Sequence, residues 1–407
     1  MSSALPQPAG SFDPLPMEAS QYKPRPWLTQ VMLTTIANWG AKLGAVWIGI
    51  IAFCAVFAPF LANSFPVAIK MNGRWSSPLL EHLTFADVSL LVITFASIPA
   101  LLIRRLAFTV RLWIICAIIA VTVTVCWFTV RPPQVEVYEQ YRQAQAAGQV
   151  QFALNAPIPF SPSDRLRDQF TLNNPHPWAP SRQHLLGTER YGADILSRMI
   201  HASRIAMTIG FISTGIALVI GVIIGGLMGY FAGWVDLLGM RLVEIFGEIP
   251  TIYLLLAFVA FFPRNIYLIM VIIGLTSWVG NARFVRAEFL KLRNQDFVQA
   301  AIAAGLPLRS ILFRHLLPNA LAPLLVSASF GVASAILAET TLSFLGLGLV
   351  DEPSWGQLLN QAVSAGGGFY WWLATFPGLA IFLTVFAYNL VGESLRDALD
   401  PKLQKSQ

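Results

Sequence analysis

The chain has 407 residues, of which 56% are hydrophobic and only 12% are charged, and its formal net charge is +6. A soluble globular domain carries about 25% charged residues, so this composition and the mean hydropathy of +0.62 exclude an ordinary soluble protein. Several apolar runs approach or exceed the ~20 residues needed to cross a bilayer. We therefore predict an all-α integral membrane protein built as a polytopic helical bundle.

The surplus of positive charge lies mostly in short segments beside the apolar runs. This placement is typical of residues that orient a protein among membrane lipids, and it argues against a nucleic-acid partner. The three cysteines, Cys54, Cys116 and Cys126, all fall inside apolar runs. An odd number of such cysteines predicts no disulfide framework, and we interpret them as packing residues.

The first 42 residues are polar and rich in proline. A signal peptide would place its apolar core closer to Met1. We therefore predict a largely disordered cytoplasmic tail, residues 1–42, in front of an uncleaved first span.

Eight apolar runs follow, and we interpret each of them as a membrane span. They cover residues 43–61, 88–103, 112–130, 205–231, 249–262, 266–279, 320–345 and 371–391. The second, fifth and sixth runs are short. We expect the fifth helix to begin earlier, near Met240, whereas the second run could be re-entrant or interfacial instead of spanning.

The remaining segments complete the predicted organisation. Residues 43–130 hold the N-terminal spans, residues 131–203 form an external, periplasmic segment with a short helix over 136–149, and residues 204–398 form the transmembrane core. Basic clusters between spans two and three, between spans six and seven, and after the last span place those segments and both termini in the cytoplasm. Six spans would keep the same orientation, if the second and third runs were both absent or re-entrant. Residues 399–407 form a cytoplasmic tail.

Glycine recurs at every fourth position of the fourth span, at Gly221, Gly225, Gly229 and Gly233. Such a smooth face lets another helix approach closely. It predicts either a helix that lines a pore or contacts a partner, or ordinary packing inside the bundle.

Two carboxylates are candidates for the translocation path. Glu339 lies deep in the seventh span, and Glu248 precedes Pro250 at the start of the fifth. Carboxylates at membrane depth are costly and usually functional, and Pro250 should break or kink its helix. The alternatives are a structural hydrogen bond for Glu339 and a solvated cytoplasmic rim for Glu248, which the nearby Arg241 favours.

The sequence contains no recognisable catalytic, metal-binding or nucleotide-binding motif. The five histidines show no metal-ligand spacing, and neither a CxxC pair nor a phosphate-binding loop occurs. We therefore expect no metal site, no catalytic residue and no ATP hydrolysis by the chain itself.

The cytoplasmic loop 283–318 is the most patterned polar segment. Asp296 and Gln299 have the spacing of a capping box, which predicts a helix over 297–304. Gly305 supplies a left-handed stop and Pro307 discourages continuation. A helix of two turns is unstable alone. Its small residues and its larger anchor, Phe297, suit a groove on a partner, and the alternative is a surface helix without one.

This loop resembles the "EAA" loop of binding-protein-dependent ABC importer permeases. That pattern is Glu-Ala-Ala, three residues, glycine, nine residues, an aliphatic residue, any residue and Leu-Pro. The matching positions here are Gln299 for the glutamate, Ala300, Ala301, Gly305, His315 for the aliphatic residue, Leu317 and Pro318. The Gln299 and His315 departures put in doubt a charge contact at the glutamate position, but not the helix–turn shape.

Further segments resemble the dipeptide and oligopeptide (OppC/DppC-like) branch of these permeases, namely residues 186–198, 344–348 and 396–401. Residues 69–78 look like the YejE-type permeases of Yej peptide and microcin C importers. The resemblance is strong over residues 182–403. Because this branch usually has six spans, the runs 88–103 and 112–130 would be two extra N-terminal spans.

The resemblance implies a permease subunit that forms half of a translocation path for peptides, completed by a second permease subunit. A periplasmic peptide-binding protein would deliver the substrate. Two cytoplasmic ATPase domains would bind ATP and Mg, so no cofactor is expected on this chain. The Phe297 to Gly305 helix would sit in a groove on one of them. The competing hypotheses are a stand-alone secondary transporter or channel, motivated by Glu339 and the glycine-rich span, and an intramembrane enzyme.

Overall fold

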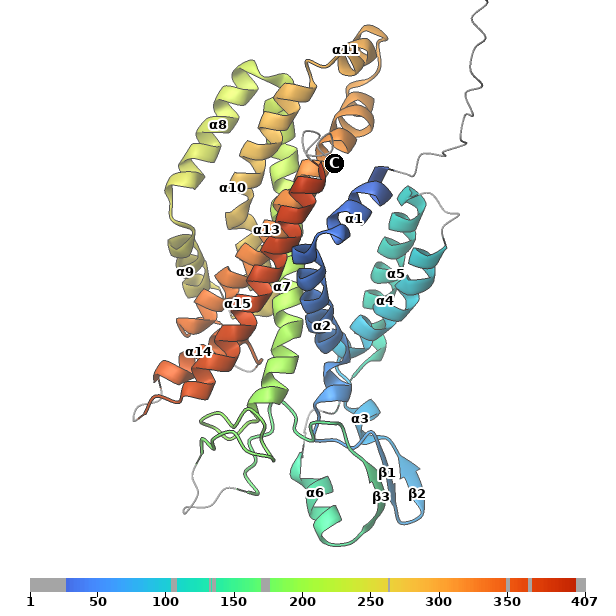
Figure 1. Ribbon diagram of the computed structural model, residues 1–407, viewed down its shortest axis with the longest axis vertical. Helices are drawn as coiled ribbons and strands as arrows, with labels where there is room; N and C mark the ends of the chain where they lie inside the picture. The colour runs from blue at the N-terminus through green and yellow to red at the C-terminus, as the bar shows by residue number, and fades with distance from the viewer. Residues whose placement is uncertain are drawn as a thin grey trace, which may run out of the picture.

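The computed structural model of this protein is an elongated helical bundle with a small sheet at one end (Figure 1). It describes residues 27–103, 108–131, 133, 137–169, 176–262, 264–348, 352–364 and 368–399. The predicted C-terminal tail and most of the predicted N-terminal tail lie outside these residues.

Two helices begin the described chain. These are α1 (Trp27–Ala37) and α2 (Trp39–Leu61), and the Asn38 side chain between them accepts a hydrogen bond from Gly40 N. The prediction of a tail that runs to residue 42 is therefore wrong for its last part. α1 is helical because it has an apolar face to bury: it contacts α15, and its Val31 is 6% exposed.

A small sheet follows, which the sequence analysis did not predict. Strand β1 (Ala68–Met71) pairs antiparallel with β2 (Arg74–Ser76) and with β3 (Val150–Leu154), in the order β2-β1-β3. The predicted short helix in the outer segment is present as α6 (Glu139–Ala146). Figure 1 shows the sheet and α6 together at one end of the molecule, and α11 at the opposite end.

A helical hairpin lies beside α2. After the short α3 (Pro78–Glu81), helix α4 (Phe85–Leu102) starts at a capping box, in which Thr84 and Asp87 each hydrogen-bond the other's backbone. α4 packs on α5 (Phe108–Thr129) and contacts α2. α5 has the length and hydropathy of a span, whereas α4 is a shorter apolar helix.

The core of the bundle is built around α7 (Ile195–Phe231), whose 37 residues run for about 55 Å. It packs along α10 (Ile266–Leu292) and also contacts α2 and α13 (Leu317–Phe344). Helix α14 (Trp355–Ser364) lies between α13 and the last helix, α15 (Trp371–Leu399). α7 is therefore longer than the ~30 Å hydrocarbon thickness of a bilayer.

The predicted fifth span is broken. Helix α8 (Gly233–Glu248) ends at Ile249, and α9 (Thr251–Phe261) follows at a bend of 78°. Pro250 causes the break, because proline has no N–H to donate and its ring would clash with the carbonyl four residues earlier in a continuous helix. Among the described residues, six helices are long and apolar enough to cross a membrane, or seven if the bent pair is one span.

Candidate functional site

Helix α11 (Asp296–Ala303) lies between α10 and α13 at the end of the bundle away from the sheet (Figure 1). It begins after a turn in which Gln295 N bonds to Leu292 O. The predicted capping box between Asp296 and Gln299 is not formed. The N-cap is Gln295, and the Gln299 side chain instead donates to the Arg293 carbonyl oxygen at 2.8 Å. Gln299 therefore ties α11 back to the end of α10 through a neutral hydrogen bond.

One face of α11 is buried against the core. Val298 is fully buried and Ala301 is 6% exposed. They join a cluster whose other members come from α10, the turn after α11 and the start of α13: Val285, Phe289, Ile311, Leu316, Ala320 and Leu324. The expectation that Ala301 belongs to the partner-facing surface is therefore wrong, because the i, i+3 pair Val298 and Ala301 forms the inner face of the helix.

The rest of α11 is exposed and mostly apolar. Phe297, which is 41% exposed, and Ile302, which is 43% exposed, flank the buried pair on either side, and Ala300 and Ala303 lie on the side away from it. Leu306 and Leu308 continue the exposed apolar surface just beyond the helix. A helix that buries one apolar face and exposes another has a second surface available for packing.

Gly305 ends α11 as predicted. Its φ is +69°, in the left-handed region that a side chain with a Cβ atom disfavours. Gly305 N bonds to Ile302 O at 2.9 Å, and Leu306 N bonds to Ala301 O at 3.2 Å. These two bonds form a Schellman motif, which turns the chain toward Pro307.

The return to the membrane passes through α12 (Leu308–Ser310) and a π-helical turn, η1 (Ile311–Leu316), into α13. Leu317 N bonds to Leu312 O, five residues back, and Pro318 follows in the first turn of α13. Pro318 lacks an N–H and its ring would crowd the carbonyl four residues before it. The wider turn accommodates this. His315 lies within η1, where its carbonyl accepts from the Asn319 side chain at 2.6 Å.

Glycines of α7 allow close contact with α10, the helix against which α11 packs. A Cβ added at Gly221 would lie 2.5 Å from Asn281 Cβ, one at Gly229 would lie 2.6 Å from Phe289 Cβ, and one at Gly225 would meet the Ala282 carbonyl oxygen. These three positions let α10 lie directly against α7. Gly233 departs from the expected face: α7 ends at Phe231, and Gly233 starts α8 with φ +53° and open space around it.

Polar contacts fix the same end of the bundle. The Arg286 guanidinium of α10 makes two hydrogen bonds to the Asp236 carboxylate of α8, and Arg293 donates to Tyr230 O of α7 at 2.9 Å. Paired hydrogen bonds between a guanidinium and a carboxylate restrict both distance and orientation. These contacts join α7, α8 and α10, and α11 is anchored to α10 through the Gln299 hydrogen bond and the buried cluster.

The sequence is similar to those of known proteins. Residues 221–405 match the family of binding-protein-dependent transport system inner membrane components. The oligopeptide transport permease OppC of Haemophilus influenzae is 42% identical over 54% of this chain and 70% of its own length. The inner membrane ABC transporter permease YejE of Escherichia coli is 31% identical over 88% of this chain and 92% of its own length. The chain belongs to this family.

A further relative agrees with the assignment. The di/tripeptide permease DppC of Pseudomonas aeruginosa is 39% identical over 62% of this chain and 84% of its own length. A solved structure of the MetNI methionine ABC transporter overlaps 50% of this chain and 97% of its own at a TM-score of 0.41 and 18% identity, too distant to add to the sequence relationship. This chain is the permease component of a bacterial ABC importer, a multi-pass protein of the inner membrane.

The two carboxylates that were predicted for the translocation path lie in different surroundings in the permease. Glu339 is 3% exposed and accepts a hydrogen bond from Ser343 at 2.6 Å and another from Ser354, just before α14. Glu248 is the last residue of α8 and is exposed. Arg241 pairs with Glu244 at 2.7 Å on the same exposed helix. The structure therefore does not bring Glu248 and Glu339 into one site.

A buried network that the sequence did not indicate lies at the start of α7. Arg198 of α7 is paired with Glu189 at 3.1 Å and donates to Gln357 of α14 at 2.6 Å. Gln361, one turn further along α14, donates to Glu189 at 2.8 Å. Glu189 and Arg198 both lie in the 186–198 segment, but Gln357 is far away in the sequence, so no local pattern indicates the contact.

Within the described ranges, no group of three or more histidine, cysteine or carboxylate side chains has suitable geometry to hold a metal ion.

Proposed function

We propose that this permease imports peptides, and that both of its termini and α11 lie in the cytoplasm while the sheet and α6 lie in the periplasm. The names of its relatives support the substrate class, because they include oligopeptide and di/tripeptide permeases. The distribution of basic residues supports the orientation: Arg283, Arg286, Lys291, Arg293, Arg309 and Arg314 all lie near the α11 end.

We further propose its partners. A second permease subunit completes the translocation path, a periplasmic peptide-binding protein delivers the peptide, and two ATPase domains bind ATP and Mg. The permease itself holds no cofactor and performs no hydrolysis. The ATPase that holds α11 can shift the permease between states only if it binds α11 differently in those states.

The two-sided packing of α11 is the observation that carries the proposal. Its inner side, Val298 and Ala301, is joined to α10 and α13 in one buried cluster. Its outer side presents Phe297, Ala300 and Ile302. A force applied to the outer side therefore reaches two membrane helices at once, because packed interiors transmit displacement with little compression.

The coupling role is tested at Gly305 with a matched pair of variants. Open space surrounds this glycine, so a side chain meets no neighbour and only the φ of +69° opposes it. Gly305→Val should unwind the Schellman turn, whereas Gly305→Asn should keep it, because asparagine tolerates the left-handed region. The complete transporter is reconstituted in proteoliposomes with its partners, and ATP-driven peptide uptake is measured. We expect Gly305→Val to lose uptake and Gly305→Asn to retain most of it.

Normal uptake by Gly305→Val, with its turn shown to be disrupted, would remove α11 from the coupling mechanism. The competing hypothesis of a stand-alone transporter or channel is tested in the same liposomes without ATPase. It predicts gradient-driven flux from this chain alone. The features that suggested it are engaged in internal contacts, since Glu339 is bonded to serines and three of the four glycines contact α10.

A further inference from the structure

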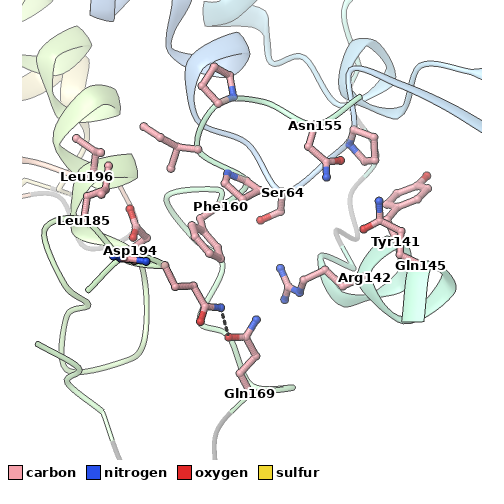
Figure 2. Close-up of a pocket in the computed structure, with 16 residues that line it drawn as sticks. Ser64, Tyr141, Arg142, Gln145, Asn155, Phe160, Gln169, Leu185, Asp194 and Leu196 are labelled. Atoms are coloured by element: carbon pink, nitrogen blue, oxygen red, sulfur yellow. Dashed lines mark hydrogen bonds between the residues drawn. The ribbon is translucent and has the colours of Figure 1, made fainter. Parts of the chain in front are cut away.

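A cavity of about 420 Å³ lies at the periplasmic end, between α6, the loop that precedes α7, and the segment that follows α2. Its size falls within the ~300–1,000 Å³ of small-ligand sites. Neither α11 nor the carboxylates discussed above contribute to it. Figure 2 shows Tyr141, Arg142 and Gln145 on one side, with Phe160, Leu185 and Leu196 on the other.

The lining combines apolar walls with side-chain amides. Phe160 and three prolines, Pro66, Pro157 and Pro159, form apolar surface. Four amides contribute to the same cavity: Gln145, Asn155, Gln169 and Gln183. An amide side chain has both donors and an acceptor, so this set can meet the alternating N–H and C=O groups of a peptide backbone.

Most of these amides have hydrogen-bonding capacity to spare. Gln183 donates to Gln169 at 3.3 Å, a long bond that is drawn in Figure 2. The side-chain amides of Gln145 and Asn155 have no hydrogen-bond partner within the part of the chain that the structure describes. By contrast, the Asp194 carboxylate is fully engaged, because it accepts from His184 and from Ser197 N at 2.9 Å each.

The charges of the cavity leave one cation without a carboxylate. Arg142 is bound to Asp164 and to Asp168, at 2.5 and 2.8 Å. Burial acts to raise the pKa of Asp168, but the hydrogen bonds from Arg142 outweigh it and hold that pKa below its ordinary value. Arg182 has no ion-pair partner among the described residues. The cavity is therefore suited to a ligand with one negative charge.

We propose that this cavity binds a short peptide, with Arg182 pairing its terminal carboxylate, the amides meeting its backbone and Phe160 packing a side chain. The ligand class rests on the proposed peptide transport, and the site itself rests on the lining. A guanidinium pairs with a carboxylate through two parallel hydrogen bonds, which makes the free carboxylate the feature that the site recognises. The cavity would hold peptide at the outer surface, outside the membrane-spanning path.

The test uses the full-length permease in lipid nanodiscs and two probes, the tripeptide Ala-Leu-Ala and its C-terminal amide. Titration calorimetry measures the Kd of each. We expect the free acid to bind at least tenfold more tightly than the amide. Arg182→Gln should abolish that preference. The matched control is Arg167→Gln, which removes the same charge from a separate outer concavity shared with Arg165 and Tyr191, and it should keep the preference.

A second variant tests the cavity volume. Asn155→Trp fills the space from an exposed position and should eliminate binding of both probes while circular dichroism stays unchanged. The proposal is overturned if the wild type shows no saturable binding, if acid and amide bind equally, or if Arg167→Gln behaves as Arg182→Gln does. Peptide uptake by the reconstituted transporter is measured in parallel. Uptake without cavity binding overturns this inference alone, whereas binding without uptake overturns the proposed function alone.

Discussion

The α7–α10 pair and the α4–α5 hairpin are both apolar, but they are assembled differently. In the most apolar window of α10, 50% of the residues are buried, whereas the corresponding share for α5 is 11%. α7 and α10 meet through glycines that bring their backbones together. The hairpin contacts α2, and the Asp87 carboxylate of α4 pairs with Arg204 of α7 at 2.6 Å.

This difference separates a closely packed core, which carries α11, from a part that is attached beside it. Close backbone packing leaves α7 and α10 little freedom to slide, and α11 is anchored on the same unit. The hairpin presents most of its surface outward, as a membrane helix can do because lipid is as apolar as its side chains. It is secured at one end by a buried ion pair.

The largest expected effect comes from the glycine contact. Gly225→Leu places a side chain against the Ala282 carbonyl oxygen and forces α7 and α10 apart. We expect it to destabilise the folded bundle by at least about 3 kcal/mol. The control is Gly215→Leu on the same helix, where an added Cβ meets nothing within 4 Å. Thermal unfolding in detergent compares the two, and an unchanged midpoint for Gly225→Leu would contradict the packing described here.

The hairpin's attachment is tested at Arg204. Arg204→Met leaves the buried Asp87 carboxylate without its partner, which should cost about 3 kcal/mol. The effect should be local, with faster hydrogen exchange in α4 and α5 and none in α10. The double variant Arg204→Met/Asp87→Asn removes the unpaired charge and should recover much of the loss. An equal increase of hydrogen exchange in α10 would show that the hairpin and the core do not unfold independently.

The two faces of α11 should respond differently to truncation. Val298→Ala removes buried methyl groups and should lower the free energy of unfolding by about 2 kcal/mol. Phe297→Ala alters an exposed side chain, so it should leave stability unchanged and reduce ATPase-coupled uptake. Thermal unfolding and uptake are measured on both variants. A stability loss for Phe297→Ala and an uptake loss without a stability loss for Val298→Ala would contradict the assignment of the two faces.

The smallest effect concerns the segment between α5 and α7 and depends on pH. Because the folded-state pKa of Asp168 is depressed below its unfolded value, its pairing with Arg142 stabilises the fold at neutral pH. That contribution is lost as the pH falls below about 4 and through the folded pKa. Asp168→Asn should cost at most about 1 kcal/mol at pH 7. The difference in free energy of unfolding between this variant and the wild type should shrink as the pH is lowered. A difference that grows at low pH would contradict the depressed pKa of Asp168.

Sequence alone predicted much of this molecule where local rules decide the outcome. The left-handed stop at Gly305 and the break at Pro250 follow from backbone constraints at single residues, and both were predicted. The inward orientation of Ala301 was not, although the spacing of Val298 and Ala301 signals a buried face. The amino-acid types of α11 suit either orientation, and only the position of α10 and α13 decides between them.

Contacts between residues far apart in the sequence could not be predicted from local patterns. The β1–β3 pairing joins residues about 80 positions apart, and Arg204 and Asp87, which form an ion pair, are 117 positions apart. Gly233 fits the four-residue repeat of the other glycines, yet the chain turns at Ala232 before reaching it. Periodicity shows which residues share a helix face only as far as the helix continues.

The central claim is that α11 contacts a partner ATPase with its outer face, and adjacent residues test it most directly. Ala300 is exposed and Ala301 is 6% exposed, on the same helix. Each is changed to cysteine in a background without Cys54, Cys116 and Cys126, and a cysteine is placed in turn along the ATPase groove. Disulfide cross-linking is then followed in the assembled transporter. We expect Ala300→Cys to cross-link to the ATPase and Ala301→Cys not to. Equal cross-linking at both positions, or none at Ala300→Cys, would contradict the account.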